Sequence, residues 1–461
     1  MTKKPWQGRF KKEIDKAFEQ FSESISFDQR LAIYDVQAGK AHIEGLLKIG
    51  VLTKEEAKKL LDGLKQIEQE IESKKFKPKP ELEDIHMNIE QRLFELCGEL
   101  AGKLHIGRSR NDLVVADIKL WLKDEIKNIL KKLKALVKAI VIQAENNLNI
   151  IMPGYTHTRP AQPVLFSHWL LAYAWMFTRD RERLINVREI SDYCPLGSGA
   201  LAGSNFPLDR KFLAEKLGFS KITLNSMDAV SDRDFLIDFL SACALIMLHL
   251  SRLAEELIWM SGEEFAFFDL PEELCTGSSM MPNKKNPDSL ELIRGKAGRV
   301  FGNLIALFTL MKSTPLAYNR DFQEDKERVF DSADTVESSL EIMKLVIKGL
   351  KPNSKQLKKA CEKGFILATD LADYLVKKGS GFRQAHFIVG ELVKYCEEKG
   401  ERLEELNLDE FKSKSELFEE DVFNILSLEK SVQSKNLVGG TAPKRVKEQI
   451  RKIKSILEKW S

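Results

Sequence analysis

The sequence has little that would build a disulfide framework, a metal centre or a nucleic-acid surface. Its 461 residues include six cysteines and seven histidines, and no two cysteines have the CxxC spacing of zinc or redox sites. The cysteines fall within apolar helical patterns, which predicts reduced thiols in a core. Lysine and arginine total 72 against 69 acidic residues, so no strongly charged face that would attract nucleic acid or anionic membrane is expected.

Features of a secreted or membrane protein are also missing. Residues 1–8 contain no apolar run of the kind that a signal peptide carries. The most apolar helical pattern contains Asp238, Arg252 and Glu255, which argues against a membrane span. The sequence therefore predicts a soluble, cytoplasmic protein.

What the sequence does have is long helical patterning with almost no strand-like alternation. Apolar residues recur three or four apart through residues 115–148, which predicts one helix of roughly 50 Å. A second pattern begins with a Ser-x-x-Asp cap at Ser231 and ends at Gly262, and a third covers residues 289–315. Helices this long and this apolar predict an all-α bundle that self-association completes.

Breaks in the patterning divide the chain into three parts. Residues 1–112 mix helical patterns with Gly and Pro breaks, residues 113–360 hold the long helices, and residues 361–461 are shorter and more charged. We therefore expect an N-terminal helical domain, a central long-helix bundle domain and a small C-terminal helical domain.

The loop at residues 276–288 is rich in groups that bind anions. Gly277 lets the backbone approach a ligand, Ser278 and its neighbour supply hydroxyls, and two lysines supply positive charge. Pro287 presets the start of the next helix, and Glu291 lies in its first turn. Gly-Ser-Ser alone usually belongs to an ordinary solvated loop, but the full run Gly-Ser-Ser-x-Met-Pro-x-Lys-x-Asn-Pro is far more specific.

This run resembles the signature loop of the fumarase/aspartase superfamily, homotetrameric lyases that split an amine or hydroxyl from a succinyl group and leave fumarate. Six further segments resemble the argininosuccinate lyase branch in the expected order: residues 24–28, 84–90, 107–112, 154–163, 194–203 and 317–326. Adenylosuccinate lyase ranks second, because it usually differs around residues 109–112 and typically has Arg where Lys285 stands. The resemblance implies a three-domain fold with a central bundle completed by tetramerisation.

The resemblance also implies roles for individual residues. Ser278 would be the base, activated by loop amides and by Lys284 in a water-excluded site. His157 would be the general acid, oriented by Glu291, although the opposite assignment of base and acid stays open. The residues expected to contact substrate are Ser24, Asn111, Thr156, Asn286, Tyr318, Gln323 and Lys326, with His86 as a weaker candidate.

The same resemblance implies the partners and cofactors. The substrate would be argininosuccinate, cleaved to arginine and fumarate in the last step of arginine biosynthesis. Neither a metal nor an organic cofactor is expected. The protein would be a homotetramer with three subunits contributing to each active site, and it would bind neither nucleic acid nor membrane.

Less specific interpretations stand beside these. Ser24 could simply cap a helix, and His86 could be a surface histidine. The branch usually has Thr where Ile106 stands and Gln where Leu113 stands, which puts substrate affinity in question. The family has also been co-opted as delta crystallin of some eye lenses, so a purely structural role is the alternative from another class.

Overall fold

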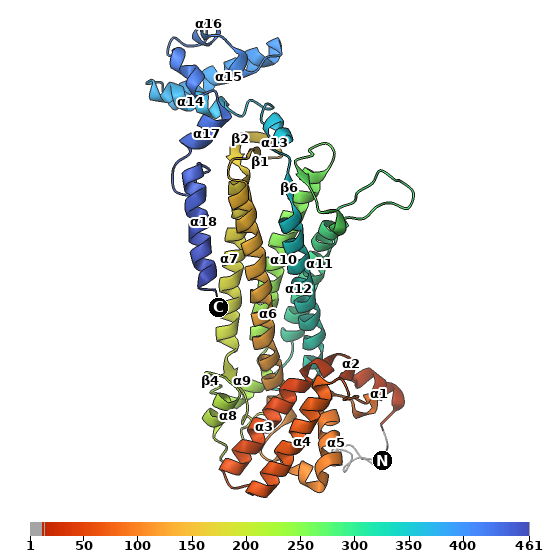
Figure 1. The fold of residues 1–461 in the computed structure, drawn as a ribbon. Helices are drawn as coiled ribbons and strands as arrows, with labels where there is room; N and C mark the ends of the chain where they lie inside the picture. Colours follow the sequence, from red (N-terminus) through yellow and green to blue (C-terminus); the bar gives the residue numbers. More distant parts are fainter. Residues whose placement is uncertain (1–11, 13, 461) are drawn as a thin grey trace. The chain divides into compact units, whose positions relative to one another are not determined.

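The computed structural model describes residue 12 and residues 14–460, and it confirms the predicted all-α fold class (Figure 1). Residues 1–8, from which the absence of a signal peptide was predicted, lie outside the described residues. Five long helices dominate: α6 (Arg110–Asn146), α7 (Phe166–Ser191), α10 (Asp234–Ser261), α11 (Asp288–Met311) and α12 (Asp325–Gly349). Three of them match the three long patterns expected from the sequence.

The chain forms two compact units whose segments interleave in sequence. Unit 1 comprises Met1–Ile129, Arg183–Ala244 and Arg299–Asp334, and unit 2 comprises Leu130–Glu182, Leu245–Gly298 and Thr335–Ser461. Each long helix contributes residues to both units. This division does not test the three consecutive domains expected from the sequence, which stay a prediction.

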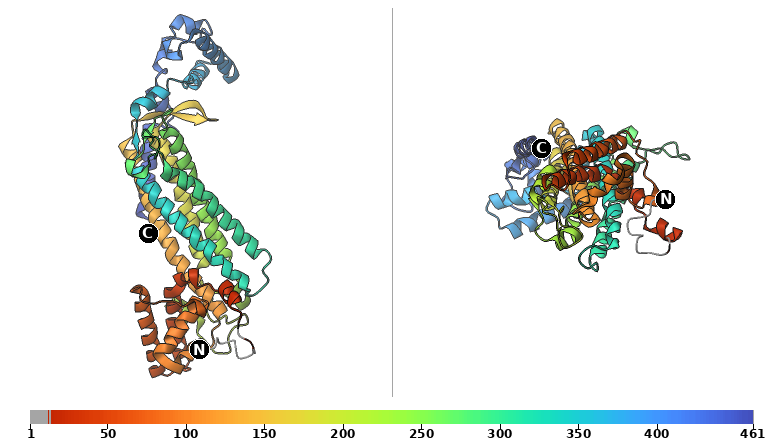
Figure 2. Two further views of the ribbon diagram at one scale, coloured as in Figure 1. Left: turned by 90° about the vertical axis from the view of Figure 1, so that its right-hand side faces the viewer. Right: turned by 90° about the horizontal axis from the view of Figure 1, so that it is seen from below.

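Unit 1 contains a layer of three helices side by side (Figure 2), namely α3 (Ala32–Lys48), α4 (Lys54–Glu72) and α5 (Ile85–Cys97). Thr53 begins α4 with a reciprocal cap: its hydroxyl accepts from the backbone N–H of Glu56, whose carboxylate accepts from the N–H of Thr53. Asp84 caps α5 by accepting from the N–H of Met87 at 2.8 Å. The other elements of unit 1 are α1 (Lys16–Ser22), α2 (Ile25–Asp28), α8 (Arg210–Lys216), α9 (Ser226–Ser231), β3 (Tyr193–Cys194) and β4 (Lys221–Ile222).

The cap predicted at Ser231 is wrong. Ser231 is the last residue of α9, where its hydroxyl donates to the carbonyl of Asp228. The next helix, α10, begins at Asp234, whose N–H donates to the carboxylate of Asp232 at 3.0 Å. Because the serine hydroxyl already serves the end of one helix, the aspartate caps the start of the next.

Unit 2 contains an antiparallel hairpin of β1 (Ile151–Thr156) and β2 (Arg159–Leu165) and a short pair of β5 (Phe268–Asp269) and β6 (Lys351–Pro352). Residues 371–422 share a core of their own, around Leu375, Leu392 and Phe411. The remaining helices of unit 2 are α13 (Ser354–Ala360), α14 (Ala368–Lys377), α15 (Phe382–Lys399), α16 (Leu408–Lys412), α17 (Leu428–Ser434) and α18 (Pro443–Glu458).

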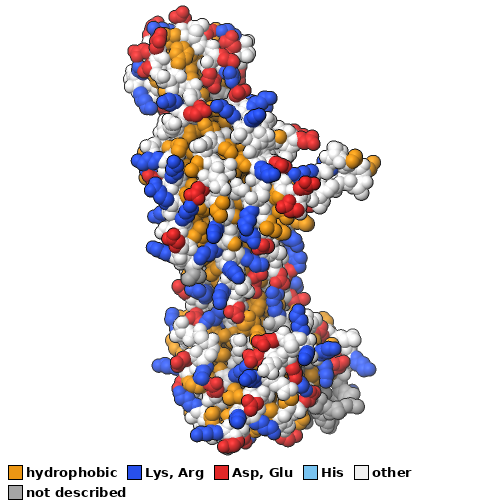
Figure 3. Space-filling model, in the orientation of Figure 1, with side chains coloured by type: hydrophobic (Ala, Val, Ile, Leu, Met, Phe, Trp, Pro, Cys, Tyr) orange, Lys and Arg blue, Asp and Glu red, His pale blue; other side chains and the backbone are white. Residues whose placement is uncertain are grey.

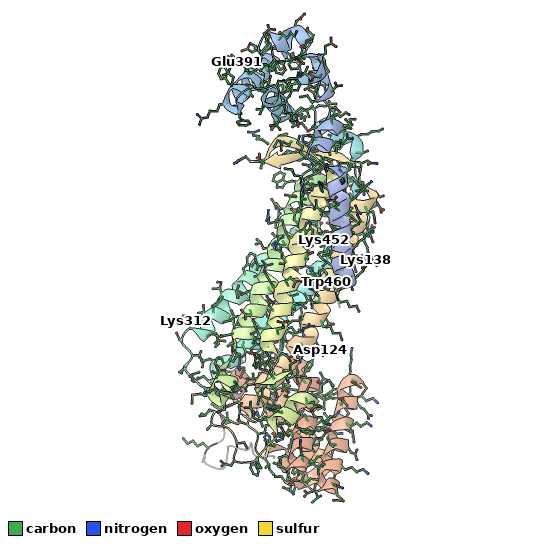
Figure 4. The ribbon with its side chains drawn as sticks, turned by 90° about the vertical axis from the view of Figure 1, so that its left-hand side faces the viewer. Asp124, Lys138, Lys312, Glu391, Lys452 and Trp460 are labelled. Atoms are coloured by element: carbon green, nitrogen blue, oxygen red, sulfur yellow. The ribbon has the colours of Figure 1, made fainter. Side chains whose placement is uncertain are left out.

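The last helix is tied to the long helices of unit 2. The indole N–H of Trp175 in α7 donates to Gln449 at 3.1 Å. Lys134 of α6 donates from Nζ to the carbonyl of Trp460, which is labelled in Figure 4, at 2.6 Å. The end of the chain therefore covers part of α6 and α7.

Helix α10 is long and apolar enough to cross a membrane, yet 56% of its most apolar window is buried within the structure. This burial is typical of a core helix, as the charged side chains of the pattern predicted. All six cysteines are free thiols, and five are buried, with Cys275 partly exposed.

Candidate functional site

The residues expected to act in catalysis and binding fall into two groups, one in each unit. Unit 1 carries Ser24, His86, Asn111, Tyr318, Gln323 and Lys326, and unit 2 carries Thr156, His157, Ser278, Lys284, Asn286 and Glu291.

Ser24 does not cap a helix with its side chain. Its hydroxyl donates to Oδ2 of Asp28 at 2.6 Å, and Oδ1 of Asp28 accepts from the N–H of Ile85 at 3.1 Å. Burial raises the pKa of Asp28 to about 6, although the charge of His86 and the hydrogen bond from Ser24 act in the other direction. Asp28 was not among the expected site residues; its spacing of four from Ser24 is the signal that could have indicated it.

Gln323 lies against the segment that precedes Ser24. Its Nε2 donates to the carbonyls of Ser22 and Glu23 at 3.3 and 3.2 Å, and its Oε1 accepts from Nε of Arg320 at 3.1 Å. The amide is thus engaged by the protein at both ends. This arrangement brings the segment of Gln323, η6 (Arg320–Glu324), beside the segment of Ser24.

His86 is a buried histidine, so the surface interpretation is wrong. Its side chain is 5% exposed, and Nδ1 donates to Oδ2 of Asp35 at 2.5 Å, with Oδ2 of Asp117 at 3.6 Å. Burial alone would lower the pKa of His86, but the hydrogen bond and charge of Asp35, with Asp84 and Asp117, outweigh it and raise the pKa to about 9. His86 therefore carries a positive charge at neutral pH.

Asp35, His86 and Asp117 lie close enough together to suggest a metal site. They come from α3, α5 and α6, so no sequence spacing could have indicated the cluster. However, the Nδ1 that would bind a metal carries the proton donated to Asp35, and a protonated imidazole is no ligand. Burial raises the pKa of Asp117 well above its usual range, and we interpret the cluster as a buried ion pair of His86 and Asp35 with a second carboxyl group beside it.

Asn111 and Asp112 fix a glycine-rich loop against the start of α6. Asn111 donates from Nδ2 to the carbonyl of Ala200 at 3.0 Å, and Oδ2 of Asp112 accepts from the N–H groups of Gly197 and Gly199 at 3.1 and 2.9 Å. Gly199 has φ +61°, and a Cβ there would meet the carbonyl oxygen of Gly203 at 2.4 Å. The loop is therefore closely specified.

Leu113 and Ile106, the two departures from the family pattern, both lie in unit 1 beside buried residues. Leu113 is 2% exposed and packs in a core cluster with Leu196 and Leu213. The carbonyl of Ile106 lies 2.9 Å from Nε2 of the buried His42. Leu113 thus belongs to the packing beneath the glycine-rich loop.

Tyr318 and Lys326 lie around Phe322. The rings of Tyr318 and Phe322 meet edge to face at 5.8 Å, and Nζ of Lys326 donates to the carbonyl of Phe322 at 3.2 Å. Burial raises the pKa of Tyr318. Lys326 also lies near enough to Asp28 to lower the pKa of that carboxyl, so Ser24, Tyr318 and Lys326, three of the residues expected to contact substrate, lie around Asp28 and Phe322.

In unit 2, His157 and Thr158 make the two-residue turn of the β1–β2 hairpin. Their φ values are +52° and +60°, a conformation in which Asn and Gly are strongly preferred. A residue other than Gly is destabilised by about 1–3 kcal/mol in this left-handed conformation, and such strain is typical of functional sites. Both residues and the adjacent Thr156 are exposed.

The loop of residues 276–287 has a fixed stem and a free tip. Thr276 and Asn286 exchange backbone hydrogen bonds of 3.1 and 2.7 Å, and the hydroxyl of Thr276 contacts the carboxylate of Asp288. At the tip Met280 is 87% exposed, and the loop stands out from unit 2 in Figures 1 and 3.

Lys285 belongs to the stem. Its Nζ donates to Oδ1 of Asp269 and to the carbonyl of Leu270, both at 2.8 Å. Its charge was expected to serve anion binding, whereas in the structure that charge is paired with Asp269. Of the two lysines, only Lys284 has no ion-pair partner among the described residues.

Ser278 lies in a local turn that polarises its hydroxyl. Oγ accepts from the N–H groups of Met280 and Met281 at 3.2 and 3.1 Å. Two donors aimed at one oxygen stabilise negative charge on it, which is what a serine base requires. The loop amides thus contact the Ser278 hydroxyl, and its role as a base stays a prediction.

A pocket of about 590 Å³ beside the stem is lined by Lys284, Asn286 and Glu291, among other residues. Ser278 and His157 are not among its lining residues, and within the described chain no hydrogen bond joins His157 to Glu291. The structure thus brings three of the six expected residues of unit 2 together. The roles of base, acid and orienting carboxylate stay predictions.

The fold and these two polar groups define a helical lyase of the fumarase/aspartase class. The structure resembles that of an EDDS lyase in complex with formate, with a TM-score of 0.86 and 28% identity over 97% of this chain and 91% of the other. It shares its fold with a class II fumarase from Schistosoma mansoni, with a TM-score of 0.77 and 16% identity over 89% and 93% of the two chains. A lyase family model matches residues 8–302.

A second family model, for the argininosuccinate lyase C-terminal region, matches residues 365–433. An argininosuccinate lyase from Aquifex aeolicus is 53% identical over 98% of this chain and 97% of its own length. One from Pseudomonas syringae is 49% identical over 99% and 98%. The chain belongs to the argininosuccinate lyase family, a family of carbon–nitrogen lyases.

Proposed function

We propose that the protein cleaves argininosuccinate to arginine and fumarate, the last step of arginine biosynthesis. A proton leaves the carbon next to a succinyl carboxylate, the bond from the neighbouring carbon to the guanidinium nitrogen breaks, and that nitrogen gains a proton. The electron pair of the broken C–H bond becomes the double bond of fumarate. No metal or organic cofactor is needed for this elimination.

Ser278 is the base of the proposed mechanism. The observation that carries this assignment is that its Oγ accepts hydrogen bonds from the N–H groups of Met280 and Met281. Closure of the exposed loop tip would exclude water and strengthen those interactions. His157 is the acid, oriented by Glu291, and Lys284 faces the developing negative charge.

The substrate contacts proposed for unit 1 are Ser24, Asn111, Tyr318, Gln323 and Lys326, with His86 supporting them from within. Those proposed for unit 2 are Thr156 and Asn286. Ser24, Tyr318 and Lys326 lie around Phe322 and Asp28, which supports a common binding surface for the substrate.

We also propose a homotetramer in which several subunits contribute to each site. Phe301, Ile305 and Phe308 are 38–62% exposed on one face of the unit 1 part of α11, where Gly302 leaves open space. Such a face is typical of a helix that packs against another subunit. We further propose that the protein is cytoplasmic and binds neither nucleic acid nor membrane. Its chain would have the three-domain organisation expected from the sequence.

The test is the ultraviolet absorbance of fumarate when the purified protein meets argininosuccinate. Adenylosuccinate, aspartate, malate and EDDS serve as comparison substrates. A rise with argininosuccinate alone is expected. A rise with another compound alone would replace the substrate while keeping the elimination chemistry, and no rise from a folded tetramer would favour the structural role known as delta crystallin.

A further inference from the structure

Lys326 is anchored by a carboxylate that is not among the expected substrate contacts. Its Nζ donates to Oδ1 of Asp325 at 2.8 Å. The side chains of Lys326 and Asp325 are 6% and 0% exposed, so this ion pair is shielded from water. The direction of the ammonium group is therefore set by Asp325 together with the carbonyl of Phe322.

The other oxygen of Asp325 serves a second buried cation. Nε of Arg233 donates to Oδ2 of Asp325 at 2.5 Å, and both side chains are fully buried. Nη1 of Arg233 donates to the carbonyl of Asp232 at 2.9 Å, whereas Nη2 has no hydrogen-bond partner in the described part of the chain. One carboxylate is thus paired with two buried cations.

The second cation connects Asp325 to Tyr318. The guanidinium of Arg233 lies over the ring of Phe322, 4.4 Å from its centroid, and the ring of Phe322 meets the ring of Tyr318 edge to face. The charge of Arg233 lowers the pKa of Tyr318, against the larger effect of burial. Any shift of Arg233 would therefore reach Tyr318 through Phe322.

Stability alone does not call for this arrangement. Burying charges is costly, and apolar side chains of similar volume commonly stabilise a fold as well or better than a buried ion pair. Asp325 and Arg233 are buried charges that lie against two expected substrate contacts, Lys326 and Tyr318. This placement favours a role in binding.

We propose that Asp325 is a positioning residue that orients Lys326 directly and Tyr318 through Arg233 and Phe322. This inference rests on the proposed function, in which Lys326 and Tyr318 contact the substrate. Removing the carboxylate charge would leave both cations free to shift. Lys326 and Tyr318 would then be displaced, while the residues proposed for catalysis stay in place.

The test compares KM and kcat of Asp325→Asn with those of Asp331→Asn in the full-length enzyme. Asp331 lies on the same helix and accepts from Nε of Arg299 at 2.7 Å, so its variant removes the same charge from a more exposed pair. Asp325→Asn is expected to raise KM at least tenfold, about the value of one charge-assisted hydrogen bond, with kcat within about threefold. Asp331→Asn should leave both constants within about twofold.

A double variant separates positioning from folding. Asp325→Asn with Arg233→Met removes both members of the buried pair, so thermal stability should return towards that of the wild type. KM should stay raised because Lys326 still lacks its carboxylate. A folded variant of either kind with the wild-type KM would overturn the proposal, and so would unfolding of both, since Asp325 would then serve the fold alone.

The wild-type enzyme is assayed first, which keeps the two proposals apart. If it releases no fumarate from argininosuccinate, the proposed function fails. If it does, and the KM of Asp325→Asn is unchanged, only the role of Asp325 fails.

Discussion

Nζ of Lys285 donates to Oδ1 of Asp269 at 2.8 Å, and this pair joins the stem of the loop at residues 276–287 to strand β5. The same nitrogen donates to the carbonyl of Leu270. Together with the backbone pairing of Thr276 and Asn286, these contacts hold the stem of the loop, whereas its tip is exposed.

Lys285→Met should lower the elimination rate while leaving the fold nearly unchanged. Both partners are substantially exposed, so the pair contributes at most about 1 kcal/mol to stability. With a looser stem, a smaller fraction of the molecules should have the loop closed over the site, so kcat/KM is expected to fall by about tenfold. Steady-state kinetics and thermal melting check this, with Lys358→Met, which breaks an exposed pair with Glu429, as the control. Wild-type kcat/KM in Lys285→Met would show that the stem contacts are dispensable.

Ser278→Ala should abolish most of the activity with the fold intact. Loss of a positioned base typically costs about 10²–10⁴-fold in rate. Fumarate release and circular dichroism measure the two effects, and Ser279→Ala is the matched control, expected to stay within about threefold of the wild type. The reverse pattern would move the base to Ser279.

Thr158→Gly should make the protein more stable and the enzyme slower. Thr158 has φ +60°, which Gly adopts without the steric cost of a Cβ, so the free energy of unfolding should rise by about 1 kcal/mol. The more flexible turn holds His157 less firmly, so kcat should fall. Thr53→Gly is the control: Thr53 has φ −74° and caps α4, so that variant should lose stability. Lower stability in Thr158→Gly would show that the turn is not strained.

Local patterns in the sequence predicted the helices well because each signal is contained within the element that forms. The spacing of apolar residues by three or four positions predicted three of the long helices. The residue types of the loop at residues 276–287 predicted a polar, exposed connection. Ser231 shows the limit of this reasoning: two adjacent candidates for a cap, Ser231 and Asp232, cannot be ranked until the end of the preceding helix is known.

The environment of each side chain could not be predicted in the same way. His86 looked like a surface residue because its burial depends on Asp35 and Asp117, which are 51 and 31 positions away. Asp325 is adjacent to Lys326 in the sequence, yet its second partner, Arg233, comes from the connection between α9 and α10, 92 positions away. Residue types therefore indicated where chemistry occurs, whereas the charges that tune it come from distant segments.

The ion pair between His86 and Asp35 predicts a loss of stability at alkaline pH. The pKa of His86 in the folded protein is about 9, above the ordinary value of about 6.5 expected for the unfolded chain. The folded state thus holds a proton that the unfolded chain releases, so the stabilisation is complete below about pH 6.5 and is lost as pH rises through 9. Its size is at most about 3 kcal/mol. Urea unfolding of the wild type and of His86→Gln, at equal protein concentration from pH 6 to pH 9.5, measures it. The difference between the two proteins should stay constant up to about pH 6.5 and shrink from there to about pH 9, and a difference that does not change with pH would mean that folding does not raise the pKa of His86.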